Sequence, residues 1–239
     1  MSATIANGLK VEWFDNMERE VTDIPLIEVY RNTALVSDDW CRSWILSAQT
    51  ALSRDFAPHW GDARLQWVGS GQAFTSGAWR LAWLDNSDVP DALGDHLTED
   101  GLPIMQIFGR DTVANNSDLS VTGIHELWEG VADPFINKTV TVGNKVYAVE
   151  VSDAVEDDRF SYFCLGHRMS NFVFPNYYEP GSAGPWDFMG TVTAPLQIAA
   201  GGYLPVRVDG VWQQEFSDIR GPRQVKGPGS RTLRRFNAA

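Results

Sequence analysis

Cysteine is scarce in this sequence, and its scarcity argues against several classes of protein. The two cysteines, Cys41 and Cys164, are too few for a disulfide framework and form no C-x-x-C metal knuckle. Cys41 lies in an apolar helical pattern, so we expect it to be a buried thiol. The glycine arrangements of a Walker loop, a dinucleotide loop and a nucleophile elbow are also missing. Nucleotide-binding enzymes and serine hydrolases of those kinds are therefore disfavoured.

Long apolar runs and a surplus of basic residues are lacking as well. No run approaches the ~18 apolar residues of a membrane span, so we expect none. The N-terminal residues lack the basic start and apolar stretch of a secretory signal, and nothing indicates export by the usual route. The formal net charge of −12 makes nucleic acid an unlikely main partner, because binding a phosphate backbone requires an excess of Lys and Arg.

The chain does contain ample material for a packed core. Of its 239 residues, 44% are hydrophobic and ten are tryptophan, which is enough for one large domain. No internal repeat or clean linker divides it. We expect an N-terminal arm or pair of strands over residues 1–30, one domain over residues 31–215, and a basic extended tail over residues 216–239.

The predicted tail differs in charge from the rest of the chain. It has little apolar content, is interrupted by Gly, Pro and Ser, and from residue 220 on has no acidic residue. One interpretation is a solvated tail, and another is an arm that docks on an acidic neighbouring subunit. Contact with nucleic acid is open to the tail alone, but Phe236 is the only aromatic residue from residue 220 on. The basic residues are Arg220, Arg223, Lys226, Arg231, Arg234 and Arg235.

The order of secondary-structure elements can be predicted from apolar periodicity. Strands or strand-like arms are expected at residues 9–14 and 24–31, and Ser37 is expected to cap a helix that ends near residues 56–58. Strands are expected at residues 64–68, 79–85 and 104–108. The connection from Asn86 to Pro103 contains Asp95-His96 and Asp100-Gly101 and is too polar for a core. We interpret His96 as a surface-loop residue, with a substrate or metal role as the alternative.

Residues 121–134, VTGIHELWEGVADP, are the most informative stretch. On a helix, positions i and i+4 share one face, so His125 and Glu129 can bind the same metal ion. Glu126 lies about 100° round the helix from His125, where it can lean over a water bound to that ion. This is the layout of an H-E-x-x-H metalloprotease with glutamate in place of the second histidine. Pro134 ends the helix, and Asp133 either orients a ligand or caps the helix end.

A hairpin is predicted to follow over residues 139–151, with Gly143-Asn144 as its turn. Three acidic residues, Glu150, Asp153 and Glu156, come at or just beyond the end of its second strand. After them the chain is rich in Gly and Pro, which is typical of loops and short strands. We assign no role to His59 or His167.

The stretch HELWEGVADPFIN followed by YAVEVSDAVE resembles the H-E-x-x-E…D-P…E-x-x-D pattern of zincin-like proteins in bacteria, plants and bacteriophages. The wider sequence, over roughly residues 30–205, is also similar to an uncharacterised group of tailed-phage proteins. The segments that carry this second resemblance are residues 93–103 (LG-x-H…G-x-P), 170–175 (SNFV-x-P) and 201–203 (GGY). The resemblance implies a zincin-like α+β fold. It would have a twisted mixed sheet, one backing helix, the metal-type helix beneath the edge strand, and an irregular C-terminal half.

Zinc is the metal expected at such a site, with His125 and Glu129 as ligands. Asp153 is the first choice for a third ligand and Glu150 the second, because a loop after the hairpin can fold back over the helix. Glu126 is then the candidate general base. Two or three carboxylates with one histidine weaken the Lewis acidity of the ion, and such a set also suits calcium.

Two functions from different classes fit these observations. The first, which the imperfect site and the arms favour, is a virion-associated structural protein on a zincin-like scaffold. It would contact other virion subunits through the N-terminal arm and the basic tail. The second is an active metal-dependent peptidase or amidase that uses Glu126 as general base. Tyr177 and Tyr178 can donate to an oxyanion, but aromatic packing is the preferred interpretation of both.

Overall fold

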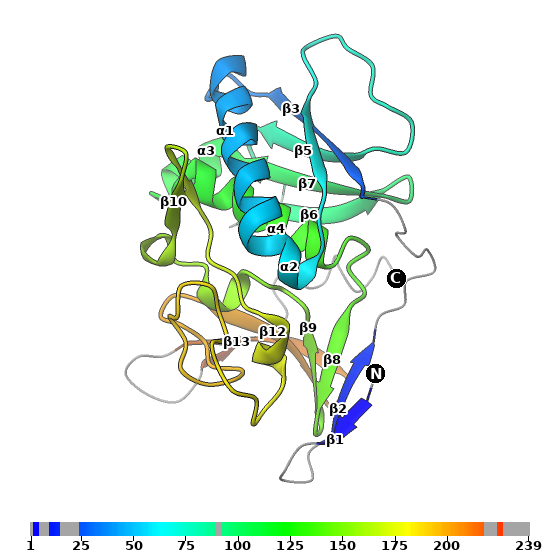
Figure 1. Ribbon diagram of the computed structural model, residues 1–239, viewed down its shortest axis with the longest axis vertical. Coiled ribbons are helices and arrows are strands. Elements are labelled where there is room, and N and C mark those ends of the chain that lie inside the picture. The colour runs from blue at the N-terminus through cyan, green and yellow to red at the C-terminus, as the bar shows by residue number, and fades with distance from the viewer. Residues whose placement is uncertain (1, 5–9, 15–23, 89–91, 218–223, 227–239) are drawn as a thin grey trace.

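The protein has a mixed α+β fold with two large sheets and few helices, which confirms the predicted class (Figure 1). The computed structural model describes residues 2–4, 10–14, 24–88, 92–217 and 224–226. Within these ranges, no helix has the length and apolar character needed to cross a membrane.

The first sheet has five strands in the order β4-β3-β5-β7-β6. Strand β3 pairs in parallel with β4 and β5, and β5 pairs in parallel with β7. The edge strand β6 runs antiparallel to β7, so the sheet is mixed, as expected. The strands are β3 (Leu26–Asn32), β4 (Arg64–Trp67), β5 (Trp79–Leu84), β6 (Gly94–Glu99) and β7 (Leu102–Phe108).

Helix α1 (Asp38–Ala51) backs the sheet at β3 and β4. Its N-cap is Ser37, whose hydroxyl accepts a hydrogen bond from the backbone N–H of Trp40, as the sequence predicted. The helix continues through a π-helical stretch (Leu52–Phe56) into α2 (Ala57–Trp60). The predicted end near residues 56–58 is therefore close to the observed one.

Helix α4 (Leu119–Ala132) lies against β6 and β7, and α3 (Gly109–Ala114) connects it to β7. The indole of Trp83 in β5 meets Trp44 of α1 edge to face, with 5.2 Å between ring centroids. It also lies directly against Gly123 of α4. Both helices therefore cover the face of the sheet on which Trp83 projects.

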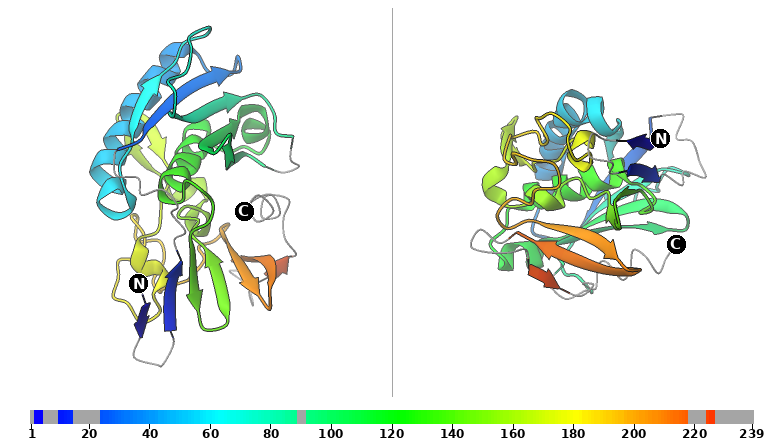
Figure 2. Two further views of the ribbon diagram at one scale, coloured as in Figure 1. Left: turned by 90° about the vertical axis from the view of Figure 1, so that its right-hand side faces the viewer. Right: turned by 90° about the horizontal axis from the view of Figure 1, so that it is seen from below.

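The second sheet has seven strands and is antiparallel throughout the described residues. Helix α4 lies between the two sheets (Figure 2). The predicted hairpin around Gly143-Asn144 is confirmed as β8 and β9. The strand order is β1 (Ser2–Thr4), β2 (Lys10–Phe14), β8 (Thr139–Val142), β9 (Lys145–Ala148), β12 (Tyr203–Val208), β13 (Val211–Phe216) and β14 (Gln224–Lys226).

The proposed arm and tail each contribute strands to this second sheet. β1 and β2 belong to the N-terminal arm, while β3 crosses its proposed boundary at residue 30. β14 lies within the proposed tail and pairs with β13, and most of the remaining tail lies outside the described residues. Between β9 and β12 the chain is irregular, with three short 3₁₀ turns (Asp153–Val155, Asp158–Phe160 and Pro175–Tyr178) and one small hairpin, β10 (Tyr162–Cys164) with β11 (His167–Met169).

Both cysteines are free and buried, as expected for Cys41. Burial raises the pKa of the Cys41 thiol to about 12, so the thiol stays protonated near neutral pH. The cysteines therefore act as apolar packing groups.

Two glycines let α4 approach the sheet closely. A Cβ on Gly123 would lie 2.9 Å from Cζ2 of Trp83 and 3.1 Å from Cζ2 of Trp44, whereas a Cβ on Gly130 would lie 2.7 Å from Cγ of Met105. Indole rings are rigid, but a methionine side chain can change rotamer.

Gly123→Ala is therefore expected to destabilise the protein, although alanine normally stabilises a helix interior by ~1 kcal/mol relative to glycine. Overpacking against the two indoles costs ~1–3 kcal/mol. Gly130→Ala is expected to cost less, because Met105 can move. Urea unfolding curves of the two variants test this order, and an equal or greater loss for Gly130→Ala would contradict it.

Candidate metal centre

Helix α4 delivers the predicted residues into the interior rather than onto the surface. Asp118 caps its start by accepting hydrogen bonds from the backbone N–H groups of Ser120 and Val121. Every residue from Ser120 to Ala132 is buried. His125, Glu126 and Glu129 are consequently buried with exposed fractions of 7%, 3% and 4%, which is unusual for ionisable groups without strong partners.

The three ligands chosen first from the sequence meet at the Nε2 atom of His125. This nitrogen lies 3.3 Å from Oε1 of Glu129, one helical turn away, and 3.2 Å from Oδ1 of Asp153. Asp153 is buried in the 3₁₀ turn that follows β9. The expectation that a loop after the hairpin folds back over the helix thus matches the observed positions.

The loop that carries Asp153 is held by segments far along the chain. The backbone N–H of Val173 donates to the carbonyl of Val151 (2.7 Å), and that of Ala199 donates to the carbonyl of Ala154 (2.9 Å). The backbone of Gly202 packs so closely on this turn that a Cβ there would lie 2.7 Å from the carbonyl oxygen of Asp153. The SNFV and GGY segments singled out in the sequence therefore position the candidate ligand.

Two further acidic residues complete this side of the cluster. Glu150 is buried, and its carboxylate lies with those of Glu129 and Asp153 in one group whose ligand atoms are all within 4.8 Å of one another. Glu156 is partly buried and forms a similar group with His125 and Asp153. Glu150, the second choice for a third ligand, is thus also within reach of a shared ion.

His96 is placed differently from the sequence prediction. It is a buried residue of β6, 4% exposed, and not a surface-loop residue. Its Nδ1 lies 3.5 Å from Oε2 of Glu129 and 3.7 Å from Oε2 of Glu126. The missed signal is the Asp100-Gly101 pair. Both of its residues have positive φ (52° and 76°), and the pair forms the two-residue turn between β6 and β7.

Glu126 lies between β6 and a pocket. Its carboxylate occupies the space where a Cβ on Gly94 would be, with its Cδ 2.7 Å from that position. The pocket has a volume of about 330 Å³ and is open on one side. It is lined by residues that include His125, Glu126, Glu156, Asp157, Asp158 and Asn116. The pocket therefore reaches the two adjacent motif residues, His125 and Glu126.

The electrostatics of the cluster favour a positive charge at His125. Burial alone lowers the pKa of its imidazole, but Glu129, Asp153 and Glu126 together outweigh burial and hold the pKa well above its usual value. The carboxylates that stabilise a proton on this ring can also bind a metal cation.

Comparison with known proteins yields no match. No family model, no curated protein and no solved structure is similar to the chain. The centre must therefore be interpreted from its own chemistry.

That chemistry fits a divalent cation. Buried imidazole nitrogens and carboxylate oxygens converge in three overlapping groups, each able to hold a metal ion. The environment of Ser152 also fits a bound cation. Ser152 is fully buried beside Glu129, towards which its backbone N–H points (3.4 Å), and its hydroxyl has no hydrogen-bond partner among the described residues. A water molecule accompanying an ion would supply such a partner.

The other candidate residues serve the structure around the cluster. Asp133 accepts hydrogen bonds from the backbone N–H groups of Asn137 and Lys138, so it organises the turn after α4. The hydroxyl of Tyr178 donates to the carbonyl of Glu150, and that of Tyr177 donates to the carbonyl of Gln197. Both tyrosines are fully buried, which favours packing over the oxyanion role.

Proposed function

We propose that the protein is a metal-dependent hydrolase of peptide or amide bonds, built on a zincin-like scaffold. The observation that carries this proposal is the convergence of His125, Glu129 and Asp153 beside Glu126, where a pocket reaches both His125 and Glu126. A histidine and two carboxylates can hold one ion, and the neighbouring glutamate can move a proton beside it.

The architecture supports the scaffold. A mixed sheet carries a backing helix, α1, and the H-E-x-x-E helix α4 packs beneath its antiparallel edge strand β6. This is the arrangement that the resemblance to zincin-like proteins implies. An edge strand beside the site can also align an extended peptide by strand addition, which favours a peptide over a compact small molecule as substrate.

The residues have separate tasks in the proposed hydrolysis. A divalent ion, when bound, polarises the scissile carbonyl and lowers the pKa of water to about 7. His125, Glu129 and Asp153 hold the ion, and the loop contacts of Val151 and Ala154 keep Asp153 in place. Glu126 accepts a proton from the attacking water and passes it to the leaving amine.

Metal content and peptide cleavage together test this proposal. Purified protein is expected to contain tightly bound zinc, to lose peptidase activity on chelation and to regain it when Zn²⁺ is added. His125→Ala is expected to weaken zinc binding by more than ~100-fold, because even the loss of an outer partner of a ligand costs 10–100-fold. His59→Ala is the matched control, since His59 is exposed and its ring packs on Phe172 and Phe174. Zinc-loaded protein without cleavage of any peptide in a broad library would contradict the hydrolase.

A second candidate function is a structural virion component, with its N-terminal arm and basic tail against other subunits. The abundance of carboxylates in the cluster favours it, because oxygen-rich sites suit calcium and a bound calcium ion would rigidify the loop that carries Asp153. Calcium instead of zinc in the purified protein, with no cleavage, would support this candidate. Normal assembly and infectivity of particles with an inactive site would do the same.

A further inference from the structure

We propose that the cluster holds two divalent cations, and that Glu129 bridges them. The first ion is the one in the proposed function, at His125, Glu129 and Asp153, and the inference rests on it. The second lies at a position formed by His96 from β6 together with Glu126 and Glu129 from α4. The ligand atoms of these three residues all lie within 4.8 Å of one another, and all three side chains are buried.

The orientation of Glu129 is that of a bridging carboxylate. Its Oε1 faces Nε2 of His125 at 3.3 Å, whereas its Oε2 faces Nδ1 of His96 at 3.5 Å. The two imidazoles come from different elements, one from the helix and one from the edge strand. A carboxylate that presents one oxygen to each of two histidines is placed to bind one ion with each oxygen. Ions joined in this way lie ~3.5–4 Å apart in hydrolytic two-metal sites.

The separations within the cluster also fit ligands around a shared ion. Distances from the histidine nitrogens to the carboxylate oxygens include 3.2, 3.3, 3.5 and 3.7 Å. Hydrogen bonds of charged pairs are shorter, at ~2.7–2.9 Å. Two ligand atoms that each lie ~2.1 Å from one tetrahedral ion are ~3.4 Å apart. The side chains therefore stand at the spacing of ligands around a metal.

The charge of the cluster favours more than one ion. It contains five carboxylates, those of Glu126, Glu129, Glu150, Asp153 and Glu156, with a formal charge of −5. One divalent ion leaves −3 and two leave −1. Four of the five carboxylates are buried, where negative charge is costly and a nearby cation lowers that cost. Two ions bring the centre close to neutrality.

The packing of Glu126 on β6 is consistent with a ligand of the second ion. Gly94 and His96 are two residues apart and lie on the same side of the strand. The absence of a side chain at Gly94 lets the Glu126 carboxylate lie against the strand, towards His96. In a two-ion centre one oxygen of Glu126 would hold the second ion, and its other oxygen would remain to accept the proton of the attacking water.

Metal titration of the chelator-treated full chain tests the second site without any activity assay. Equilibrium dialysis against Zn²⁺ alone, followed by elemental analysis, is expected to show about two ions per chain. With Mn²⁺ alone, the paramagnetic resonance spectrum is expected to show spin coupling between neighbouring ions. Saturation of the wild-type chain at one ion, or the absence of coupling, would overturn the inference.

Variants locate the second ion. His96→Ala and Glu126→Gln are expected to bind about one ion, because each loses a ligand of the second site only. Glu129→Gln is expected to weaken both sites. His59→Ala, with an exposed histidine, is expected to bind as many ions as the wild type. Circular dichroism establishes that each variant is folded, and a folded His96→Ala chain that still binds two ions would contradict the assignment.

The possible failures are distinguishable. One zinc ion per chain with metal-dependent cleavage refutes the second site and supports the proposed hydrolase. Two ions without cleavage of any peptide support the two-ion centre and refute the hydrolase. A chain that binds no divalent ion refutes both.

Discussion

Glu126→Gln is expected to lower the rate of metal-dependent peptide cleavage by roughly 10²–10⁴-fold, the usual contribution of a positioned general base. Glutamine has the shape of glutamate and fits the same space beside Gly94, so the fold should be unaffected. It cannot accept the proton of the attacking water. If Glu126 also holds the second ion, the loss of its charge removes that ion as well, and the rate falls further. The measurement is kcat/KM on a peptide substrate, with the metal content determined in the same sample.

The matched control is Glu99→Gln. Glu99 is at the far end of the same strand as His96 and pairs with Arg80 on the surface, with its side chain 55% exposed. The Glu99→Gln substitution removes the same charge from the protein without altering the buried cluster. The rate of peptide cleavage should therefore be close to that of the wild type. An equal loss of activity in the two variants would point to a general effect of charge and not to the chemistry of Glu126. Full activity of Glu126→Gln would refute the hydrolytic mechanism.

Local signals predicted much of the fold. The cap at Ser37 requires only a side-chain oxygen three residues before the Trp40 N–H, and the hairpin at Gly143-Asn144 requires only residues that tolerate positive φ. These determinants lie within a few residues, so the sequence displays them directly. The same holds for His125 and Glu129, whose shared helix face follows from their spacing.

The prediction that His96 lies in a surface loop was wrong because it used only the polarity of residues 86–103. Asp95 and His96 indicate a surface loop when polarity alone is considered, yet both are buried in an edge strand. The environment of His96 depends on Glu126 and Glu129, which are distant in sequence and lie 3.7 and 3.5 Å from its Nδ1. Asp100-Gly101 is a turn signal in the sequence. It indicates the β6–β7 hairpin when it is given more weight than the polar composition of the segment.

The position of Asp153 beside His125 depends on contacts that no local pattern reveals. The loop is held by Val173 and Ala199, and Gly202 lets a third segment approach it. Motif spacing could rank Asp153 ahead of Glu150 as a ligand, but it could not place either residue beside His125. The structure brings both into the cluster, because the loop passes close to α4 over several residues.

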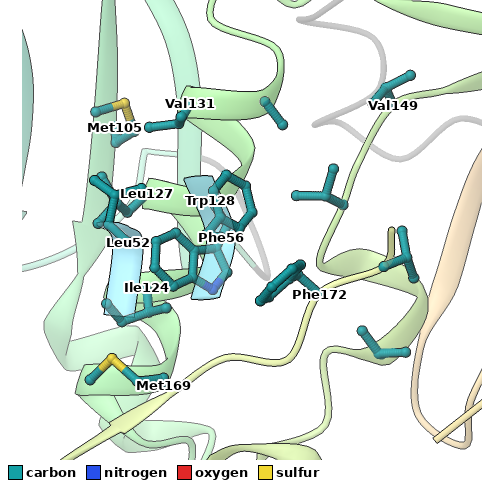
Figure 3. Packing of buried hydrophobic residues seen from close by; sticks show 14 of the residues in the cluster. Leu52, Phe56, Met105, Ile124, Leu127, Trp128, Val131, Val149, Met169 and Phe172 are labelled. Atoms are coloured by element: carbon teal, nitrogen blue, oxygen red, sulfur yellow. The ribbon is translucent and has the colours of Figure 1, made fainter. Parts of the chain in front are cut away.

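Trp128→Ala is expected to cause the largest loss of stability, because Trp128 joins the metal-type helix to the segments that hold the Asp153 loop. Its indole is fully buried and stacks on Phe56, with 4.4 Å between centroids and 8° between planes (Figure 3). Its Nε1–H donates to the carbonyl of Ser170 (3.1 Å). Truncating a buried tryptophan to alanine costs ~3–5 kcal/mol, which in a domain of this size corresponds to a fall in Tm of roughly 6–20 °C.

The same substitution should weaken metal binding, although Trp128 is not a proposed ligand. Ser170 lies three residues before Val173, whose backbone N–H donates to the carbonyl of Val151. Val151 belongs to the loop that carries Asp153. A cavity under α4 loosens this connection, so zinc affinity is expected to fall together with Tm. Phe163→Ala is the control, since Phe163 is 74% exposed and its truncation should change stability by no more than ~0.5 kcal/mol. Differential scanning calorimetry of the chelated and zinc-loaded forms measures both effects. A Trp128→Ala chain with a reduced Tm but unchanged zinc affinity would show that the ligand loop is positioned independently of this contact.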